Sequence, residues 1–113
     1  MTTVTFFKQN NQFVGLKVIG HSGYAKQGKD IVCASVSSVT QMVGAGIEQF
    51  ITKDVKIEVN QTLPSYVIQL PKNLTQQQYS NVDILMQSAY VFLKQLSMEY
   101  SKNLNVEVTN NVY

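Results

Sequence analysis

One cysteine, one histidine, no arginine and no tryptophan occur among the 113 residues of the chain. A single cysteine cannot form an internal disulfide, which favours a reducing compartment, so we expect a cytoplasmic protein. A zinc ion would need several carboxylates beside the one thiol and the one imidazole, and no ligand spacing suggests them. We therefore expect no metal and no other cofactor.

The nine basic residues are all lysines. Arginine is the residue preferred for bidentate contacts with phosphate and guanine, so its absence argues against direct binding of nucleic acid. No stretch approaches the roughly 20 apolar residues of a membrane span, and the first residues lack the basic and apolar regions of a signal peptide. We expect no membrane association, and a single domain over residues 1–113 with its own hydrophobic core.

Five stretches have the composition and the two-residue alternation of β-strands. They cover residues 4–7, 13–20, 55–59, 66–70 and 104–108, and the polar residues 8–12 and 60–65 are the expected turns of two antiparallel hairpins.

Two further stretches have apolar residues at helical steps of three and four. One runs from Val32 to Ile51, and the other from a capping box of Thr75 and Gln78 to near Lys102. The resulting order, ββαββαβ, predicts an α+β two-layer sandwich: an antiparallel sheet of about five strands with two helices packed on one face.

Gly44 and Gly46 interrupt the first of these helices. Each glycine costs about 1 kcal/mol relative to alanine in a helix interior. We expect a close approach of another part of the structure to compensate, either the sheet or a partner subunit.

His21 and Cys33, each the only one of its kind, lie on either side of a strand-to-helix junction. Closing the loop between them costs roughly 2 kcal/mol of chain entropy, so the two side chains can meet. Free amides and the positive dipole end in the first turn of a helix favour a thiolate at Cys33. The same amides could hold an oxyanion, which would supply the components of cysteine acyl transfer. A lone cysteine also fits a simple role as a small buried hydrophobic residue.

The segment around both residues resembles the ribosomal-processing cysteine protease family, called Prp. The matching residues are Gly20-His21, Gly23, Ala25 and Gly28, followed by the run Asp30-Ile31-Val32-Cys33-Ala34 with Val36 and Ser37. The resemblance implies a cytoplasmic, homodimeric endopeptidase with Cys33 as nucleophile and His21 as general base and acid. It implies as substrate the N-terminal extension of a large-subunit ribosomal protein of the twenty-seventh family, which is cut after a pair of phenylalanines.

Asp30 has two possible roles. It could orient His21 as a third catalytic group, or it could cap the helix that holds Cys33. We favour the cap, because Asp30 lies three residues before Cys33 and next to the start of the helix.

The remaining candidate residues surround this pair. Gly20 and Gly23 would let the backbone bend around His21, and Gly28 could be a hinge of the loop. By the resemblance, Ala34 and Ser37 would line the site; surface or core-edge packing explains Ser37 equally well.

Two rival hypotheses are not proteases. The first is a non-enzymatic ribosome-assembly or scaffold protein in which Cys33 is structural. The second is a redox-sensing thiol, which the lack of a resolving cysteine makes the weaker of the two.

Overall fold

The computed structural model describes residues 1–20, 23, 30–60, 62 and 64–110. His21 and Gly28 lie outside the described residues. The elements follow the predicted order: β1 (Thr2–Gln9), β2 (Gln12–Ile19), α1 (Ile31–Phe50), β3 (Lys56–Asn60), β4 (Ser65–Gln69), α2 (Gln76–Glu99) and β5 (Leu104–Asn110).

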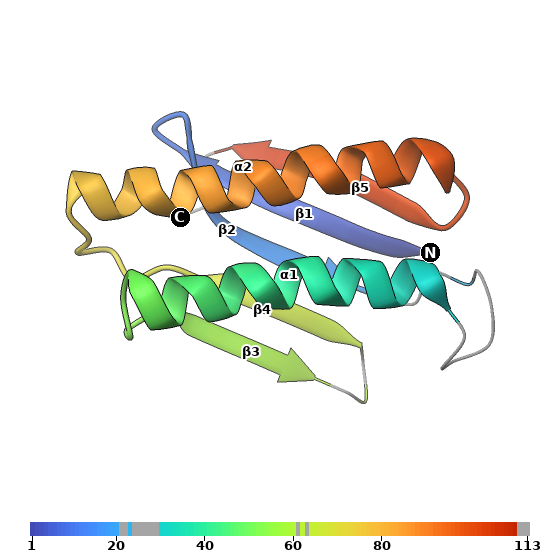
Figure 1. The fold of residues 1–113 in the computed structure, drawn as a ribbon, viewed down its shortest axis with the longest axis horizontal. Helices are drawn as coiled ribbons and strands as arrows, with labels where there is room; N and C mark the ends of the chain where they lie inside the picture. Colours follow the sequence, from blue (N-terminus) through green and yellow to red (C-terminus); the bar gives the residue numbers. More distant parts are fainter. Residues whose placement is uncertain (21–22, 24–29, 61, 63, 111–113) are drawn as a thin grey trace.

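The five strands form one sheet in the order β3-β4-β2-β1-β5, and both helices lie over the same face (Figure 1). The predicted two-layer α+β architecture is confirmed. β1 pairs with β2, β2 with β4 and β3 with β4 in antiparallel fashion, but β5 is parallel to β1. The sheet is therefore mixed. The reason is that α2 carries the chain back along the sheet, so β5 runs in the same direction as β4 and hence as β1.

The core lies between this sheet and the two helices. Its most deeply buried side chains come from every part of the fold: Phe6, Leu16, Val36, Ile47, Ile68, Met86 and Leu93. The rings of Phe6, Phe13 and Tyr90 pack against one another. Phe6 and Tyr90 meet edge to face, with their ring centroids 5.5 Å apart. This cluster joins the first hairpin to α2.

The first hairpin is longer and its turn tighter than predicted. β1 continues to Gln9 and β2 starts at Gln12, so only Asn10 and Asn11 form the turn. Both have positive φ, 52° and 64°. Asparagine tolerates this conformation, and a two-residue turn with positive φ at both positions matches the twist of the flanking strands.

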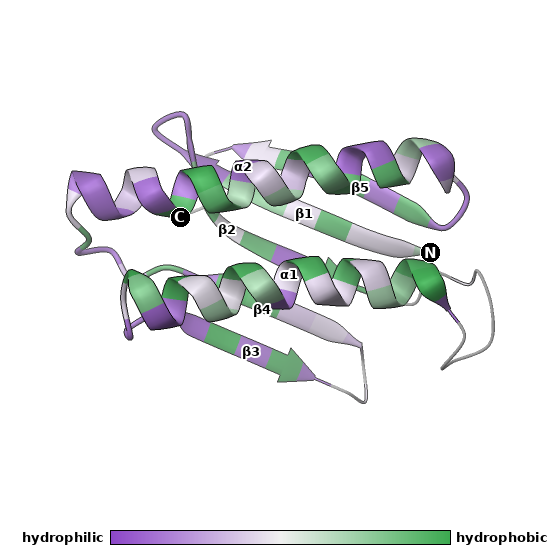
Figure 2. Ribbon diagram, viewed as in Figure 1, coloured by the Kyte–Doolittle hydropathy of each residue, from purple (hydrophilic) through white to green (hydrophobic). Residues whose placement is uncertain are grey.

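Helix α1 is the more hydrophobic of the two helices along its length (Figure 2). Its 20 residues and mean hydropathy of 1.3 meet the length and composition criteria of a membrane span, contrary to the expectation from the sequence. Six of its residues are nevertheless buried: Val32, Val36, Thr40, Val43, Gly44 and Ile47. The buried core helix of a soluble protein can meet the same criteria, so a single such helix is weak evidence for a membrane span.

The glycines of α1 have different surroundings. A Cβ on Gly44 would collide with the hydroxyl of Tyr66 and lie 3.2 Å from Cδ1 of Ile57. Side chains of the sheet thus approach the helix closely at Gly44. Of the two expected partners, the sheet and a second subunit, it is the sheet that lies against this glycine. A Cβ on Gly46 would lie 3.6 Å from Cδ1 of Leu85 in α2, an ordinary contact.

Helix α2 begins at the predicted capping box. The Thr75 hydroxyl accepts from the amide of Gln78 at 3.1 Å, and the Gln78 side chain accepts from the amide of Thr75 at 2.9 Å. The helix ends at Glu99, somewhat before the predicted end.

Candidate active site

Asp30 is the residue at which α1 begins. Its backbone is extended, with φ −82° and ψ 99°, and its carboxylate oxygen Oδ1 accepts from the amides of Val32 at 3.1 Å and Cys33 at 3.0 Å. The side chain is buried, with 9% of the residue exposed. These contacts are those of a helix cap, which is the role favoured from the sequence. Any contact with His21 lies outside the described residues.

This cap corrects one expectation about the first turn. The amides of Val32 and Cys33 already donate to the Asp30 carboxylate, and the amide of Ala34 donates to the Asp30 carbonyl at 3.0 Å. They are not free donors for an oxyanion in this conformation. The carboxylate also offsets part of the positive end of the helix dipole that would favour a thiolate.

The Cys33 side chain is half-buried and points toward the start of β1. Its Sγ lies 4.0 Å from Oγ1 of Thr2, and the Thr2 hydroxyl donates to the carbonyl of Gly20 at 3.3 Å. Gly20 is the residue directly before His21. The structure therefore brings the thiol, the first residue of β1 and the backbone preceding His21 together at one end of the sheet.

Gly20 is held by contacts on both sides. Its amide donates to the carbonyl of Pro64 at 2.9 Å, and a Cβ would lie 2.6 Å from the carbonyl oxygen of Met1. Its φ of +90° is in the region that only glycine adopts readily, and Gly23 has φ +71°. Both glycines thus have the backbone conformation that favours glycine, and the predicted bend around His21 itself lies outside the described residues.

Ala34 and Ser37 both lie on the exposed side of α1. Ser37 comes one turn after Cys33, so a molecule bound over the thiol could reach it. That either residue lines a substrate site stays a prediction.

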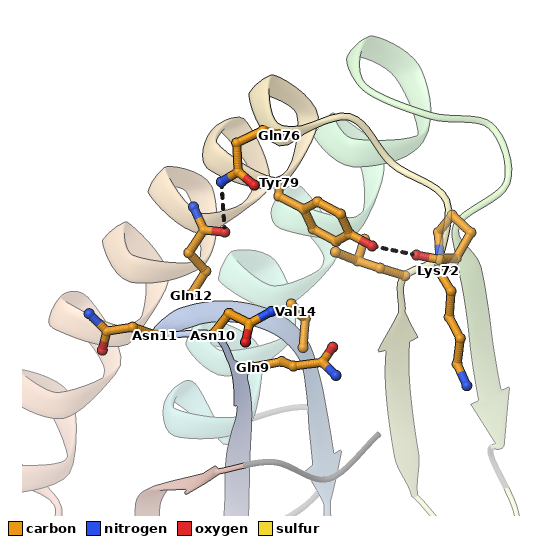
Figure 3. Close-up of a pocket in the computed structure, with 10 residues that line it drawn as sticks. Gln9, Asn10, Asn11, Gln12, Val14, Lys72, Gln76 and Tyr79 are labelled. Atoms are coloured by element: carbon orange, nitrogen blue, oxygen red, sulfur yellow. Dashed lines mark hydrogen bonds between the residues drawn. The ribbon is translucent and has the colours of Figure 1, made fainter.

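Two of the concave surfaces in the described part of the chain bear on the position of the site. The first has a volume of about 630 Å³ and lies between the β1–β2 turn and the start of α2 (Figure 3). Its rim is rich in carboxamides, and its lining is Gln9, Asn10, Asn11, Gln12, Val14, Leu70, Pro71, Lys72, Gln76 and Tyr79. Thr2, at the other end of β1, contacts Cys33, so this cavity lies roughly 25 Å away from the thiol, the length of the strand. It is not the site of cysteine chemistry.

The second surface is an open groove of about 620 Å³ along the edge strand β3 and its neighbour β4. Ser65, which lines it, follows Pro64, the residue that binds the amide of Gly20. The groove therefore adjoins the end of the sheet that holds Cys33.

A model of the cysteine protease Prp family matches residues 1–105 of the chain. The chain belongs to this family of cysteine proteases. The family resemblance that the segment around His21 and Cys33 indicates is thereby confirmed.

Solved structures show the same fold. The ribosomal processing protease Prp of Staphylococcus aureus, in complex with a covalently linked product peptide, superposes with a TM-score of 0.81 at 21% identity, over 96% of this chain and 100% of that one. The complex of the same protease with a substrate peptide superposes with a TM-score of 0.76 at 20% identity, again over 96% of this chain and 100% of that one. A protein from Streptococcus mutans gives 0.80 at 21% identity, over 98% of this chain and 96% of that one. No curated protein matches the chain significantly.

Thr2 is the residue of this Prp site that sequence reasoning misses. The signal was weak but present: Thr2 shares the inward face of β1 with Val4 and Phe6, so its hydroxyl had to be buried. What it contacts there depends on residues 20 and 33, which are brought to it only by the fold.

Proposed function

We propose that this protein is an endopeptidase that removes the N-terminal extension of a large-subunit ribosomal protein of the twenty-seventh family during ribosome maturation. Membership of the Prp family supports the cysteine protease activity. The substrate class is supported by the similarity to the Staphylococcus aureus ribosomal processing protease, which has been seen with a covalently linked product peptide. The observation that carries the proposal is the position of Cys33, in the first turn of α1 beside the backbone that leads to His21.

The proposed reaction is acyl transfer through the Cys33 thiol. His21, by the family resemblance, takes the thiol proton while Sγ attacks the scissile carbonyl carbon. The tetrahedral intermediate collapses to a thioester as the peptide nitrogen leaves with that proton. Water, deprotonated by His21, then hydrolyses the thioester and regenerates the thiol.

Asp30 acts in this reaction as the residue that fixes the first turn. Its two bonds to the amides of Val32 and Cys33 hold the backbone that carries the nucleophile. Donors for the oxyanion must come from elsewhere or from a rearrangement of this cap when the substrate binds.

We further propose that the protein acts as a cytoplasmic homodimer, as the family resemblance implies. Light scattering coupled to size exclusion would give twice the chain mass of 12.7 kDa if it does. A monomer at micromolar concentration would contradict the dimer without affecting the protease assignment.

The test of the activity uses a synthetic peptide that copies the extension and the start of the mature ribosomal protein, with mass spectrometry to map the cut. Cys33→Ala and His21→Ala should each lower kcat/KM by roughly 10³-fold or more, as for other residues that act as a catalytic unit. Ser38→Ala, which removes an exposed hydroxyl from the same helix, is the matched control and should cleave as the unmodified protein does.

Undiminished cleavage by either variant would refute the assignment of that residue. Binding of the ribosomal protein with no cleavage by the unmodified protein would instead favour the non-enzymatic assembly role, with Cys33 structural. Family membership weighs against that outcome.

A further inference from the structure

Thr2 occupies a position where the pattern of β1 calls for an apolar residue. The next two residues on the same face, Val4 and Phe6, are fully buried, and Thr2 itself is 1% exposed. A hydroxyl buried this deeply is costly unless it is hydrogen-bonded. The contacts that it makes therefore need an explanation.

The hydroxyl of Thr2 lies between two groups of the candidate active site. It donates to the carbonyl of Gly20 at 3.3 Å, and its oxygen lies 4.0 Å from Sγ of Cys33, at the outer limit of a hydrogen bond to sulfur. The backbone of Thr2 is fixed independently, because its amide donates to the carbonyl of Asn103 at 2.9 Å. Thr2 is thus a rigid support that contacts both the thiol and the chain leading to His21.

A threonine hydroxyl suits both charge states of the thiol. It has one proton to donate and two lone pairs to accept. While its proton points to the Gly20 carbonyl, a lone pair can accept the S–H of Cys33. Once the thiol has lost its proton, the sulfur can only accept, and rotation about the C–O bond lets the hydroxyl donate to it. A bond to a charged acceptor is stronger than a neutral one, so the bond that the thiolate gains offsets the bond to the Gly20 carbonyl that the rotation gives up.

We propose that Thr2 is a positioning residue for the nucleophile: its hydroxyl fixes the direction of Sγ and supports the thiolate during attack. The role in turnover rests on the proposed protease function. The effect on the reactivity of the thiol does not, so the two can be tested separately.

Two substitutions separate the hydroxyl from the shape of the side chain. Thr2→Val keeps the branched shape and suits a strand, and Thr2→Ser keeps the hydroxyl. Thr3→Val is the matched control, because it removes a hydroxyl from the next residue of the same strand, which faces the other side of the sheet. Circular dichroism checks that each variant is folded, and Thr2→Ala replaces Thr2→Val if valine disturbs the packing.

The first measurement is the rate at which iodoacetamide alkylates Cys33, followed by intact mass at fixed pH. Cys33 is the only cysteine, so the added mass reports this thiol alone. We expect alkylation of Thr2→Val to be about 5-fold slower than that of the unmodified protein, the effect of one net hydrogen bond. Thr2→Ser should recover most of the rate, and Thr3→Val should not differ from the unmodified protein.

The second measurement is peptide cleavage by the same variants. Thr2→Val should lower kcat about 5-fold and leave KM nearly unchanged, because the bond matters most in the transition state. Equal alkylation and turnover in Thr2→Val and the unmodified protein would overturn the proposal. So would a Thr2→Ser variant no better than Thr2→Val, since packing alone would then explain the effect. If the unmodified protein cleaves nothing, the protease function fails while the alkylation rates still decide the role of Thr2.

Discussion

Helix α1 begins at a buried carboxylate, whereas helix α2 begins at an exposed hydroxyl. Asp30 binds two amides of α1 from inside the fold, and Thr75 exchanges bonds with Gln78 at the surface of α2. Both caps satisfy amides that the helix cannot satisfy itself. Only the first holds a turn that carries Cys33, the proposed nucleophile.

The two helices also differ in how they are fixed to the sheet. α1 is seated by close packing, with Gly44 against the hydroxyl of Tyr66. α2 packs on the sheet through fully buried side chains such as Met86 and Leu93. It adds polar bonds: Asp83 accepts from the amide of Phe13 in β2 at 2.7 Å, and Gln78 donates to the carbonyl of Ile51, at the end of α1, at 3.0 Å. The position of α1, and hence of Cys33, thus depends on close packing at Gly44, whereas α2 has polar bonds in addition to its buried side chains.

Breaking the buried cap should have the largest effect on stability. Asp30→Ala leaves two first-turn amides without their acceptor, so we expect a loss of about 3 kcal/mol in the free energy of unfolding, more than for an exposed cap. Urea denaturation measures it. Asp30→Asn keeps an acceptor oxygen and should lose about 1 kcal/mol, the difference between a charged and a neutral hydrogen bond. If Asp30→Ala lowered the free energy of unfolding by less than Thr75→Ala does, burial would not make the Asp30 cap the more stabilising of the two.

Filling the space at Gly44 should come next. Gly44→Ala places a methyl group on the Tyr66 hydroxyl, and we expect a loss of about 2 kcal/mol despite the better helix propensity of alanine. Tyr66→Phe removes the obstructing oxygen, so the same substitution in that background should cost less than about 1 kcal/mol. Gly46→Ala, whose added methyl group makes only an ordinary contact with Leu85, is the control and should stabilise the protein by about 0.5 kcal/mol. Equal losses at Gly44 in both backgrounds would rule out the hydroxyl as the cause.

Removing the exposed cap of α2 should have a moderate effect. Thr75→Ala loses one half of the capping box, and we expect it to lower the free energy of unfolding by about 1 kcal/mol. Peptide cleavage measured well below the melting temperature should be unchanged, because α2 carries none of the candidate catalytic residues. A fall in kcat for this variant would show that the two helix ends are coupled.

The smallest effect concerns alkaline pH. Burial, and then the charge of Glu48, raise the pKa of Tyr66 above its usual value of 10.0. The folded protein therefore holds this proton more tightly than the unfolded chain does. The contribution of the protonated Tyr66 to the free energy of unfolding is fully present below pH 10. It is lost as the pH rises through the pKa of Tyr66 in the folded protein. The free energy of unfolding should thus fall more steeply above pH 10 in the unmodified protein than in Tyr66→Phe, with Glu48→Gln between them. Parallel curves would show that Tyr66 is not responsible.

Local signals predicted the parts of the fold that depend on neighbours in sequence. The capping box of Thr75 and Gln78 and the cap at Asp30 each need only four consecutive residues and a helical pattern behind them. The two hairpins were predictable because alternation and turn residues occur together. The predicted turn over residues 8–12 is longer than the observed turn at Asn10 and Asn11. The reason is that the polar residues at the two strand ends have the composition of a loop.

The features that could not be predicted from the sequence depend on contacts between segments that are distant in the chain. The direction of β5 follows from the helix that crosses the sheet before it, a rule of topology that the hydrophobic pattern does not contain. The contact of Thr2 with Cys33 joins residues 31 apart in the chain.

The parallel pairing of β1 with β5 has a consequence for how the protein is made. Thr2 is aligned with Leu104 across that pair, and its amide binds the carbonyl of Asn103. During synthesis β1 leaves the ribosome well before β5, its partner in the sheet. Pairing across such a sequence separation is slow. We therefore expect the contact of Thr2 with Cys33 to be completed only after β5 has emerged and paired with β1, so that a nascent copy would acquire its full reactivity only then.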